Sequence, residues 1–390
     1  MNRMQLAVAG IGVAITLGAA AQDVPVNKAE FDQLQAEVQE LKALLHNKHR
    51  DEAAAEKSSS MHDALALAVE ALPENFEFGA LFEVEGSYRR ERKGGDKESD
   101  ITMATVELSA GWQLLDWLRG DLGFLYEEDD TEPMEVDQAM ITIGSTDKFP
   151  LYFQAGKMYV PFGNFDTFFI TDPVVLELAE SRETAALLGF KKGGFMASVS
   201  VFNSDVDTED GGDHIENAVL AASYSMESDN FAFAVGSALI RNMFTADTLN
   251  DEVDDFRAAG GNVYLDDDTG GFNAWATLTY GRATLIAEYV KALDAVMFDD
   301  GADAAKIKPE SFNLELGLEV TDRIGAAVKY ERSRRIADIF AKNRCGFVGS
   351  YILAENDICT LTASVEYMRE DFGAGERDAD VVTGQLALEF

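Results

Sequence analysis

The sequence predicts an all-β protein: a 16-stranded antiparallel transmembrane β-barrel preceded by a short N-terminal coiled-coil helix. Three features indicate this fold, namely an N-terminal export signal, repeated alternation of apolar and polar residues, and no later apolar segment of spanning length. Alternation with a period of two is typical of a strand with one apolar and one polar face. Without a segment long enough for a spanning helix, any membrane crossing must use strands.

Residues 1–21 have the three parts of a secretory signal peptide. Arg3 supplies the positive charge, an apolar run reaches Gly18, and small residues end at Ala21. A membrane anchor is the alternative, but the apolar run is shorter than the ~20 residues that span a bilayer. We expect cleavage after Ala21, which places the mature chain beyond the inner membrane.

Residues 22–50 predict a short coiled-coil helix, because their apolar residues step by three and four positions. This helix is either an oligomerisation stalk in the periplasm, forming a homo-oligomer, or a single amphipathic helix packed on a neighbour. Residues 51–74 are assigned as a linker, because the chain is polar and rich in alanine and serine to about Ser60; a short helix over about 61–72 is expected before Pro73. The apolar positions of the coiled-coil helix are Phe31, Leu34, Val38, Leu41 and Leu45.

Residues 75–390 predict the barrel. A soluble sandwich with one buried face would also alternate, but the export signal, the aromatic strand ends and the strand length of ~10 residues favour a barrel. The terminal Phe390, which closes an alternating segment, resembles the C-terminal signature of bacterial outer-membrane barrels. The predicted strands are 76–89, 100–113, 117–127, 135–145, 151–160, 184–191, 194–203, 215–226, 231–242, 272–280, 282–292, 310–320, 323–334, 345–354, 358–369 and 380–390.

Short polar turns at one end of these strands and long connections at the other match the periplasmic and outer ends of such barrels. Sixteen strands leave a water-filled interior. Residues 243–271 are taken as one long outer connection, with a strand over 256–265 as the alternative. Cys345 and Cys359 fall at opposite ends of neighbouring strands, with Cys345 facing residues near 366, so we expect two free thiols.

The chain has 32 basic and 70 acidic side chains, a formal net charge of −38. This charge excludes nucleic-acid binding, which needs a basic surface. The predicted outer connections are especially acidic, and they either capture cations or bridge lipid phosphates through divalent ions, or form a solvated, repulsive surface. With four histidines and two cysteines, we assign no metal ligand, cofactor site or catalytic residue.

The connection 161–183 is long and aromatic, which is unfavourable in water, so we expect it to fold into the barrel and narrow it. The alternative is packing on the barrel rim or on a neighbouring subunit. Arg89 and Glu315 are further expected to face the lumen. The candidate constriction residues are Lys157, Phe162, Phe165, Asp172, Glu177, Glu180 and Arg182.

Two strings carry a family resemblance. YVPFGNFDTFFITDPVVLELAESRETAALLGF, and RCGFVGSYILAENDICTLTASVEYMREDFG followed by VVTGQLALEF, are similar to the LbtU-type siderophore porin family, and the N-terminal layout agrees. The resemblance implies a porin of the Gram-negative bacterial cell outer membrane that takes up ferric siderophore without an energised plug, with its N-terminal helix in the periplasm. The two cysteines depart from what we expect in relatives.

The function expected from the sequence is therefore a passive, substrate-selective channel, and by resemblance a channel for ferric siderophore. Its expected partners are outer-membrane lipid and lipopolysaccharide, the barrel assembly machinery and a small-molecule solute. A general diffusion porin with no iron role is the alternative. A hydrolase is disfavoured because His214 is the only histidine of the barrel region and no GxSxG motif is present. A structural tether would not need so wide a lumen.

Overall fold

The computed structural model describes residues 75–128, 133–204, 214–265, 269–301, 304–334, 340–373 and 377–390. The predicted signal peptide, coiled-coil helix and linker lie outside these ranges, as do parts of the acidic connections. The structure therefore bears on the barrel alone.

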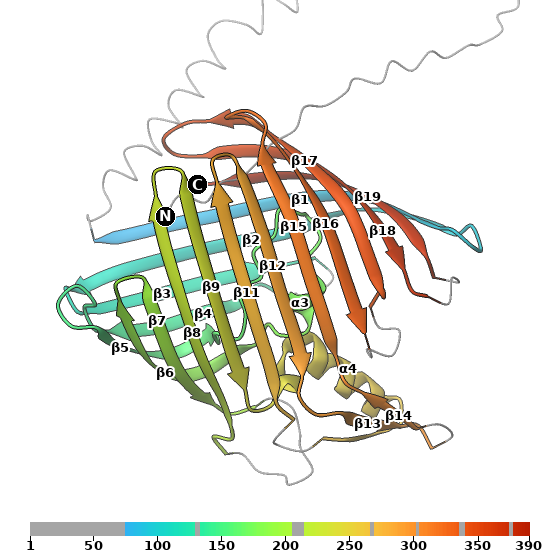
Figure 1. Ribbon diagram of the computed structural model, residues 1–390, viewed down its shortest axis with the longest axis horizontal. Coiled ribbons are helices and arrows are strands. Elements are labelled where there is room, and N and C mark those ends of the chain that lie inside the picture. The colour runs from blue at the N-terminus through green and yellow to red at the C-terminus, as the bar shows by residue number, and fades with distance from the viewer. Residues whose placement is uncertain are drawn as a thin grey trace, which may run out of the picture. The chain divides into compact units, whose positions relative to one another are not determined.

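In the described ranges, sixteen strands form one closed antiparallel barrel, as predicted (Figure 1). Neighbours in sequence are neighbours in the wall, and each predicted strand corresponds to an observed one. The barrel strands are β1 (Phe76–Glu91), β2 (Lys97–Leu115), β3 (Leu118–Tyr126), β4 (Glu135–Ile143), β5 (Leu151–Tyr159), β6 (Arg182–Lys192), β7 (Phe195–Phe202), β8 (Asn217–Ser228), β9 (Phe231–Ile240), β11 (Gly271–Tyr280), β12 (Ala283–Ala292), β15 (Glu310–Glu319), β16 (Ile324–Arg334), β17 (Asn343–Glu355), β18 (Thr360–Asp371) and β19 (Ala379–Glu389).

Closure of the barrel pairs β1 with β19. The Phe390 N–H donates to the Ala80 carbonyl at 3.0 Å, and the Ala80 N–H donates to the Phe390 carbonyl at 2.6 Å. The ring of Phe390 stacks on Phe82, with the centroids 6.0 Å apart. These contacts satisfy the backbone groups at the seam, which have no water partner inside a membrane.

The two faces of each strand differ in exposure. On β15, Leu316 is 50% exposed on the outer surface, whereas Glu315 is fully buried inside. The outer surface is an apolar band suited to lipid, and the inner surface carries the polar residues. Exposed aromatic residues near the short-turn end, where membrane interfaces favour them, include Trp112, Trp117 and Tyr280.

The long connections contain structure that the sequence analysis did not predict. Between β9 and β11 lie η1 (Met243–Thr245), α4 (Asp247–Ala258) and the short β10 (Asn262–Tyr264). The segment 243–271 does connect adjacent wall strands, and the alternative strand over 256–265 is present only as β10 outside the wall, because 256–258 end a helix. β10 pairs with β13 (Val296–Asp299), which pairs with β14 (Ala304–Ile307), in a small three-stranded sheet.

Cys345 and Cys359 are free thiols, as predicted. The expected register was wrong, however: Cys345 pairs with Arg369 rather than with a residue near 366. The register differs because Leu353 is left unpaired at a bulge and the turn extends to Cys359. The two thiols still lie at opposite ends of the β17–β18 hairpin.

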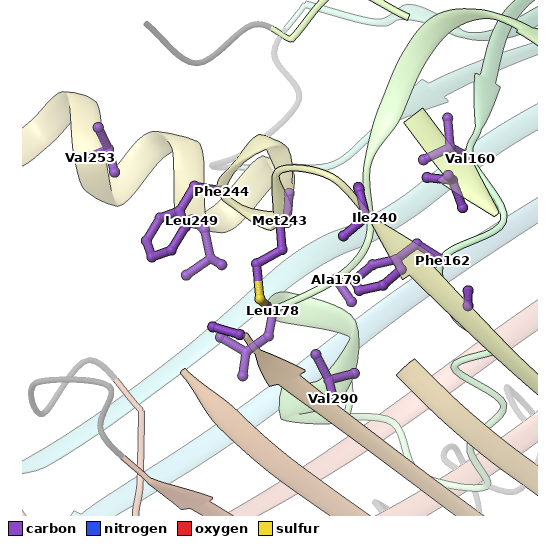
Figure 2. Packing of buried hydrophobic residues seen from close by; sticks show 14 of the residues in the cluster. Val160, Phe162, Leu178, Ala179, Ile240, Met243, Phe244, Leu249, Val253 and Val290 are labelled. Carbon is purple, nitrogen blue, oxygen red and sulfur yellow. The ribbon is translucent and has the colours of Figure 1, made fainter. Parts of the chain in front are cut away.

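The barrel interior is not simply water-filled. The connection between β5 and β6, residues 160–181, contains α3 (Val174–Glu177) and contacts inward-facing side chains of the wall, and Figure 1 shows α3 within the ring of strands. Its apolar side chains join those of β9, η1 and α4 in one buried cluster. Figure 2 shows this packing, with Phe162, Leu178, Ile240 and Met243 converging from separate segments.

Candidate functional site

Loop 160–181 begins and ends where β5 meets β6. Tyr159 pairs with Arg182, and the Val160 N–H donates to the Ser181 carbonyl at 3.0 Å. β6 therefore begins at Arg182, so Arg182 and Glu183 belong to a strand and not to the connection predicted over 161–183. Phe162 is 1% exposed and Leu178 is fully buried. The loop is anchored by apolar burial at both of its ends.

Two wall carboxylates hold the first half of the loop. Glu288 on β12 accepts the N–H of Asn164 at 3.0 Å and that of Phe165 at 2.8 Å. Glu315 on β15 accepts the Phe168 N–H at 2.8 Å. Buried amide groups must find acceptors, and a carboxylate makes a stronger hydrogen bond than a neutral oxygen. Phe165 has φ = 55°, a conformation unfavourable for a bulky residue, and the Glu288 carboxylate holds it in place.

Two more carboxylates hold the second half. Glu366 on β18 accepts the N–H of Ile170 at 2.7 Å and of Thr171 at 3.1 Å. Glu331 on β16 accepts the Val174 N–H at 2.9 Å, at the first residue of α3. From Asn164 to Val174, the loop backbone is thus hydrogen-bonded to four inward-facing glutamates of the wall.

Two wall cations compensate these buried carboxylates. Lys329 Nζ lies 3.2 Å from Glu315 Oε1, and both side chains are fully buried. Arg344 Nε lies 3.1 Å from Glu331 Oε2. Each cation also donates to a loop carbonyl: Lys329 to Thr171 at 3.2 Å and Arg344 to Asp172 at 2.9 Å. Buried charges are tolerated when they are paired and hydrogen-bonded in this way.

Two inward-facing glycines leave room for loop aromatics. A Cβ on Gly317 would lie 2.6 Å from the Phe168 ring. One on Gly346 would lie 2.4 Å from the Tyr367 carbonyl oxygen and 3.2 Å from the Phe169 ring. Phe169 also carries Lys329 Nζ over its ring, 4.7 Å from the centroid. The wall and the loop are therefore complementary in shape as well as in charge.

The candidate constriction residues occupy three different environments. Phe162 and Phe165 pack in the apolar cluster. Asp172 and Glu177 line a cavity of about 680 Å³ between the loop and the wall. Lys157 and Arg182 line a separate cavity of about 930 Å³ that also contacts α4.

Glu180 completes the candidate set, and the negative charges of Asp172 and Asp247 act on it. Burial, and then these neighbouring carboxylates, raise the pKa of Glu180 to about 8. Asp172 is exposed to the 680 Å³ cavity, but the surrounding protein limits the hydration of its carboxylate. This desolvation raises the pKa of Asp172, and the positive charge of Lys329 partly opposes the rise. Arg182 forms ion pairs with Glu135 and with Asp137, the latter at 3.1 Å.

The two strand residues that we expected in the lumen have different roles. Glu315 holds the loop, as described, whereas Arg89 is paired with Glu370 at 2.5 Å. The sequence analysis missed the other residues that hold the loop or line the cavity. Alternation places them all on the polar face of a strand, but it does not show which of them meet the loop. These residues are Glu83, Glu85, Glu288, Lys329, Glu331, Arg344 and Glu366.

Neither a metal centre nor a helical membrane span is found in the described part of the chain. No group of three or more His, Cys, Asp or Glu side chains in those ranges is placed to hold a metal ion. Of the helices described there, none has the length and apolar character that a membrane crossing requires.

No known family model matches the chain. Among curated sequences it is similar to a UPF0422 protein of Coxiella burnetii, 24% identical over 234 residues, covering 57% of this chain and 48% of that protein. A UPF0422 protein of Legionella pneumophila strain Lens is 29% identical over 105 residues, covering 25% of this chain and 20% of that protein. The chain thus spans less than half the length of the curated relatives it matches.

Solved structures resemble the barrel over most of its length. OmpF of Salmonella typhi, in a complex with daunomycin, aligns with a TM-score of 0.55 and 11% identity, over 81% of this chain and 97% of that one. Pseudomonas putida OprB aligns with a TM-score of 0.55 and 12% identity, over 84% and 96%. An anion-selective porin from Comamonas acidovorans aligns with a TM-score of 0.53 and 11% identity, over 80% and 98%. The fold is a porin-type barrel. At these identities the likeness extends to the fold alone.

Proposed function

We propose that the protein is a passive channel of the bacterial outer membrane, and that its opening is the cavity of about 680 Å³ beside loop 160–181. The observation that carries the proposal is a closed barrel whose inward loop leaves a polar-lined space next to the wall. Sixteen-stranded barrels enclose an aqueous channel, and constrictions within them select solutes. The porin-type fold and the apolar outer band support contact with outer-membrane lipid and lipopolysaccharide, and assembly by the barrel assembly machinery.

In this proposal Asp172 and Glu177 line the narrowing itself, while Phe162 and Phe165 fix the path of the loop. Lys157, Glu180 and Arg182 lie where the loop leaves the wall and set its position. Arg182 is suited to this because it bridges β6 to two β4 carboxylates.

Single-channel conductance in planar bilayers tests the channel and its constriction together. The purified protein should conduct, and deletion of residues 166–180 should raise the conductance and admit larger solutes in liposome swelling. Unchanged conductance in a correctly folded deletion variant would show that the loop does not limit flow. A wild-type protein that inserts into bilayers without conducting would refute the channel.

Ferric siderophore is the finer candidate cargo, and the resemblance of residues 159–190, 344–373 and 381–390 to siderophore porins supports it. The geometry adds one condition: the carboxylates around the opening favour a chelate that is neutral or positively charged. Addition of a ferric chelate to the bilayer chamber should block ion current in steps, whereas the iron-free chelator should block less. Equal block by both forms would favour the general diffusion porin.

A further inference from the structure

The charged residues that line the opening share one sign. In the described ranges, every charged side chain that lines the cavity of about 680 Å³ is acidic. Two of these carboxylates come from β1, two from loop 160–181 and one from the residue directly after β3, so they surround the space from different elements. They are Glu83, Glu85, Glu127, Asp172 and Glu177.

The β1 carboxylates point inward as a consequence of the strand period. Glu83 and Glu85 are two positions apart, and Val84 between them is exposed on the outer, apolar face. Glu85 Oε1 accepts a hydrogen bond from Gln385 Nε2 at 2.9 Å, which fixes its position on the wall. Asp172 lines the same cavity from the loop side.

Five cations of the barrel interior are paired with carboxylates that do not line this cavity. Each of the five lies within 3.2 Å of its carboxylate, which offsets most of its positive field at the opening, although Lys329 and Arg344 still act on Asp172. By contrast, Glu83, Glu85 and Asp172 make no ion pair with any residue in the described ranges. The neutralised cations are Lys329 with Glu315, Arg344 with Glu331, Arg182 with Asp137, Arg89 with Glu370, and Arg119 with Asp121.

We propose that the opening is cation-selective, with Glu83, Glu85 and Asp172 as specificity-determining residues, and that its substrates are small cations and small solutes of net positive charge. This inference rests on the proposed channel function. Rings of Asp and Glu side chains give cation selectivity, and a low-dielectric wall focuses their field on the passing ion. The long-connection end, where α4 carries Asp251, Asp254 and Asp255, adds attraction of the same sign.

The test is the reversal potential of the wild-type protein in a planar bilayer under a KCl gradient, at neutral pH. We expect the reversal potential to have the sign that preferential permeation of potassium over chloride produces. A unit charge ~5 Å from a permeating ion changes the local concentration of that ion about fourfold in water. Salt screens this effect. We therefore expect the triple variant E83Q/E85Q/D172N to lower the potassium-to-chloride permeability ratio about tenfold.

The matched control is D96N/E98Q/D100N, which also removes three carboxylates, all exposed on the β1–β2 hairpin away from the cavity. Its permeability ratio should equal that of the wild type. The single variant Asp172→Asn serves if the triple variant folds poorly, because this side chain makes no ion pair that folding would lose; its expected fall is about twofold.

The outcomes separate this inference from the proposed function. A conducting wild type without cation preference, or a triple variant that keeps the wild-type ratio, overturns cation selectivity and leaves the channel standing. An equal fall in the control would assign selectivity to overall charge instead of the opening. Absence of conductance refutes the channel itself.

Discussion

Replacing Lys329 with methionine tests whether the buried ion pair supports loop 160–181. The methionine has a similar length but carries no charge, so the Glu315 carboxylate loses the cation 3.2 Å away. Both side chains are fully buried, so bulk solvent does not screen the charge that is left unpaired. The substitution also removes the hydrogen bond from Lys329 Nζ to the Thr171 carbonyl and the cation above the Phe169 ring.

The expected cost follows from leaving one charge buried and uncompensated. Removing one partner of a buried pair costs about 3–5 kcal/mol, several times the contribution of an exposed pair. We therefore expect the free energy of unfolding of Lys329→Met, measured by urea titration in lipid vesicles, to fall by about 3–5 kcal/mol. The double variant Lys329→Met/Glu315→Gln should recover part of that loss, because it removes the unpaired charge.

Lys148→Met is the matched control. Lys148 pairs with Asp116 at 2.7 Å, a shorter distance than in the buried pair, but both side chains are largely exposed in a turn. Solvent and salt screen such a pair, so unfolding should be indistinguishable from wild type. If Lys329→Met is as stable as Lys148→Met, the buried pair does not hold the loop. If the double variant is less stable than Lys329→Met, the loss does not come from an unpaired Glu315 charge.

Three further predictions concern packing, pH and the thiols. Gly317→Ala places a Cβ 2.6 Å from the ring of a loop phenylalanine and should cost about 1–3 kcal/mol of unfolding free energy, whereas Gly120→Ala, with nothing within 4 Å, should cost none. As pH rises through about 8, Glu180 should ionise and raise cation conductance, and Glu180→Gln should remove this step. Because the pKa of Glu180 is near 4.5 in the unfolded chain, the free energy of unfolding should fall between about pH 4.5 and pH 8 and then level off. Alkylation of the unfolded protein without reductant should add two labels, one each at Cys345 and Cys359, by intact mass, and no label would contradict the strand arrangement.

The strands were predictable because lipid on one side and water on the other impose a period of two along every wall segment. Their ends were less predictable, because pairing with the neighbour decides where a strand begins. β6 starts at Arg182, two residues earlier than predicted, since Tyr159 extends the ladder to that point. Similarly, the Leu353 bulge shifted the register of the closing hairpin.

The helix α4 was missed although its sequence carried a signal. Leu249, Val253 and Phe256 follow the i, i+4, i+7 spacing of a helix with one apolar face. The surrounding aspartates suggested a solvated connection, but they occupy the remaining faces of the helix, while Leu249 and Val253 are buried in the cluster of Figure 2. High acidity and a packed helix are therefore compatible in one segment.

The loop's destination was predictable from its composition, but its partners were not. Aromatic residues in a long connection need burial, which predicted an inward path. Which wall residues receive the loop depends on how strands distant in sequence are arranged around the barrel. Glu288, Glu315 and Glu366 look alike in the alternation, as do Glu83 and Glu85, yet the first three accept loop amides and the last two face the opening.

The net charge of the chain is consequently a poor guide to its selectivity, whereas the division of the inward-facing carboxylates is a good one. Those beneath the loop accept hydrogen bonds from its amide groups, and two of them, Glu315 and Glu331, also pair with Lys329 and Arg344, so they stabilise structure and contribute little field to a passing solute. Glu83 and Glu85 on the cavity wall form no ion pair with any residue in the described ranges, so their field acts on whatever enters. The path of loop 160–181 therefore decides which wall glutamates bind its backbone and which remain facing the solute.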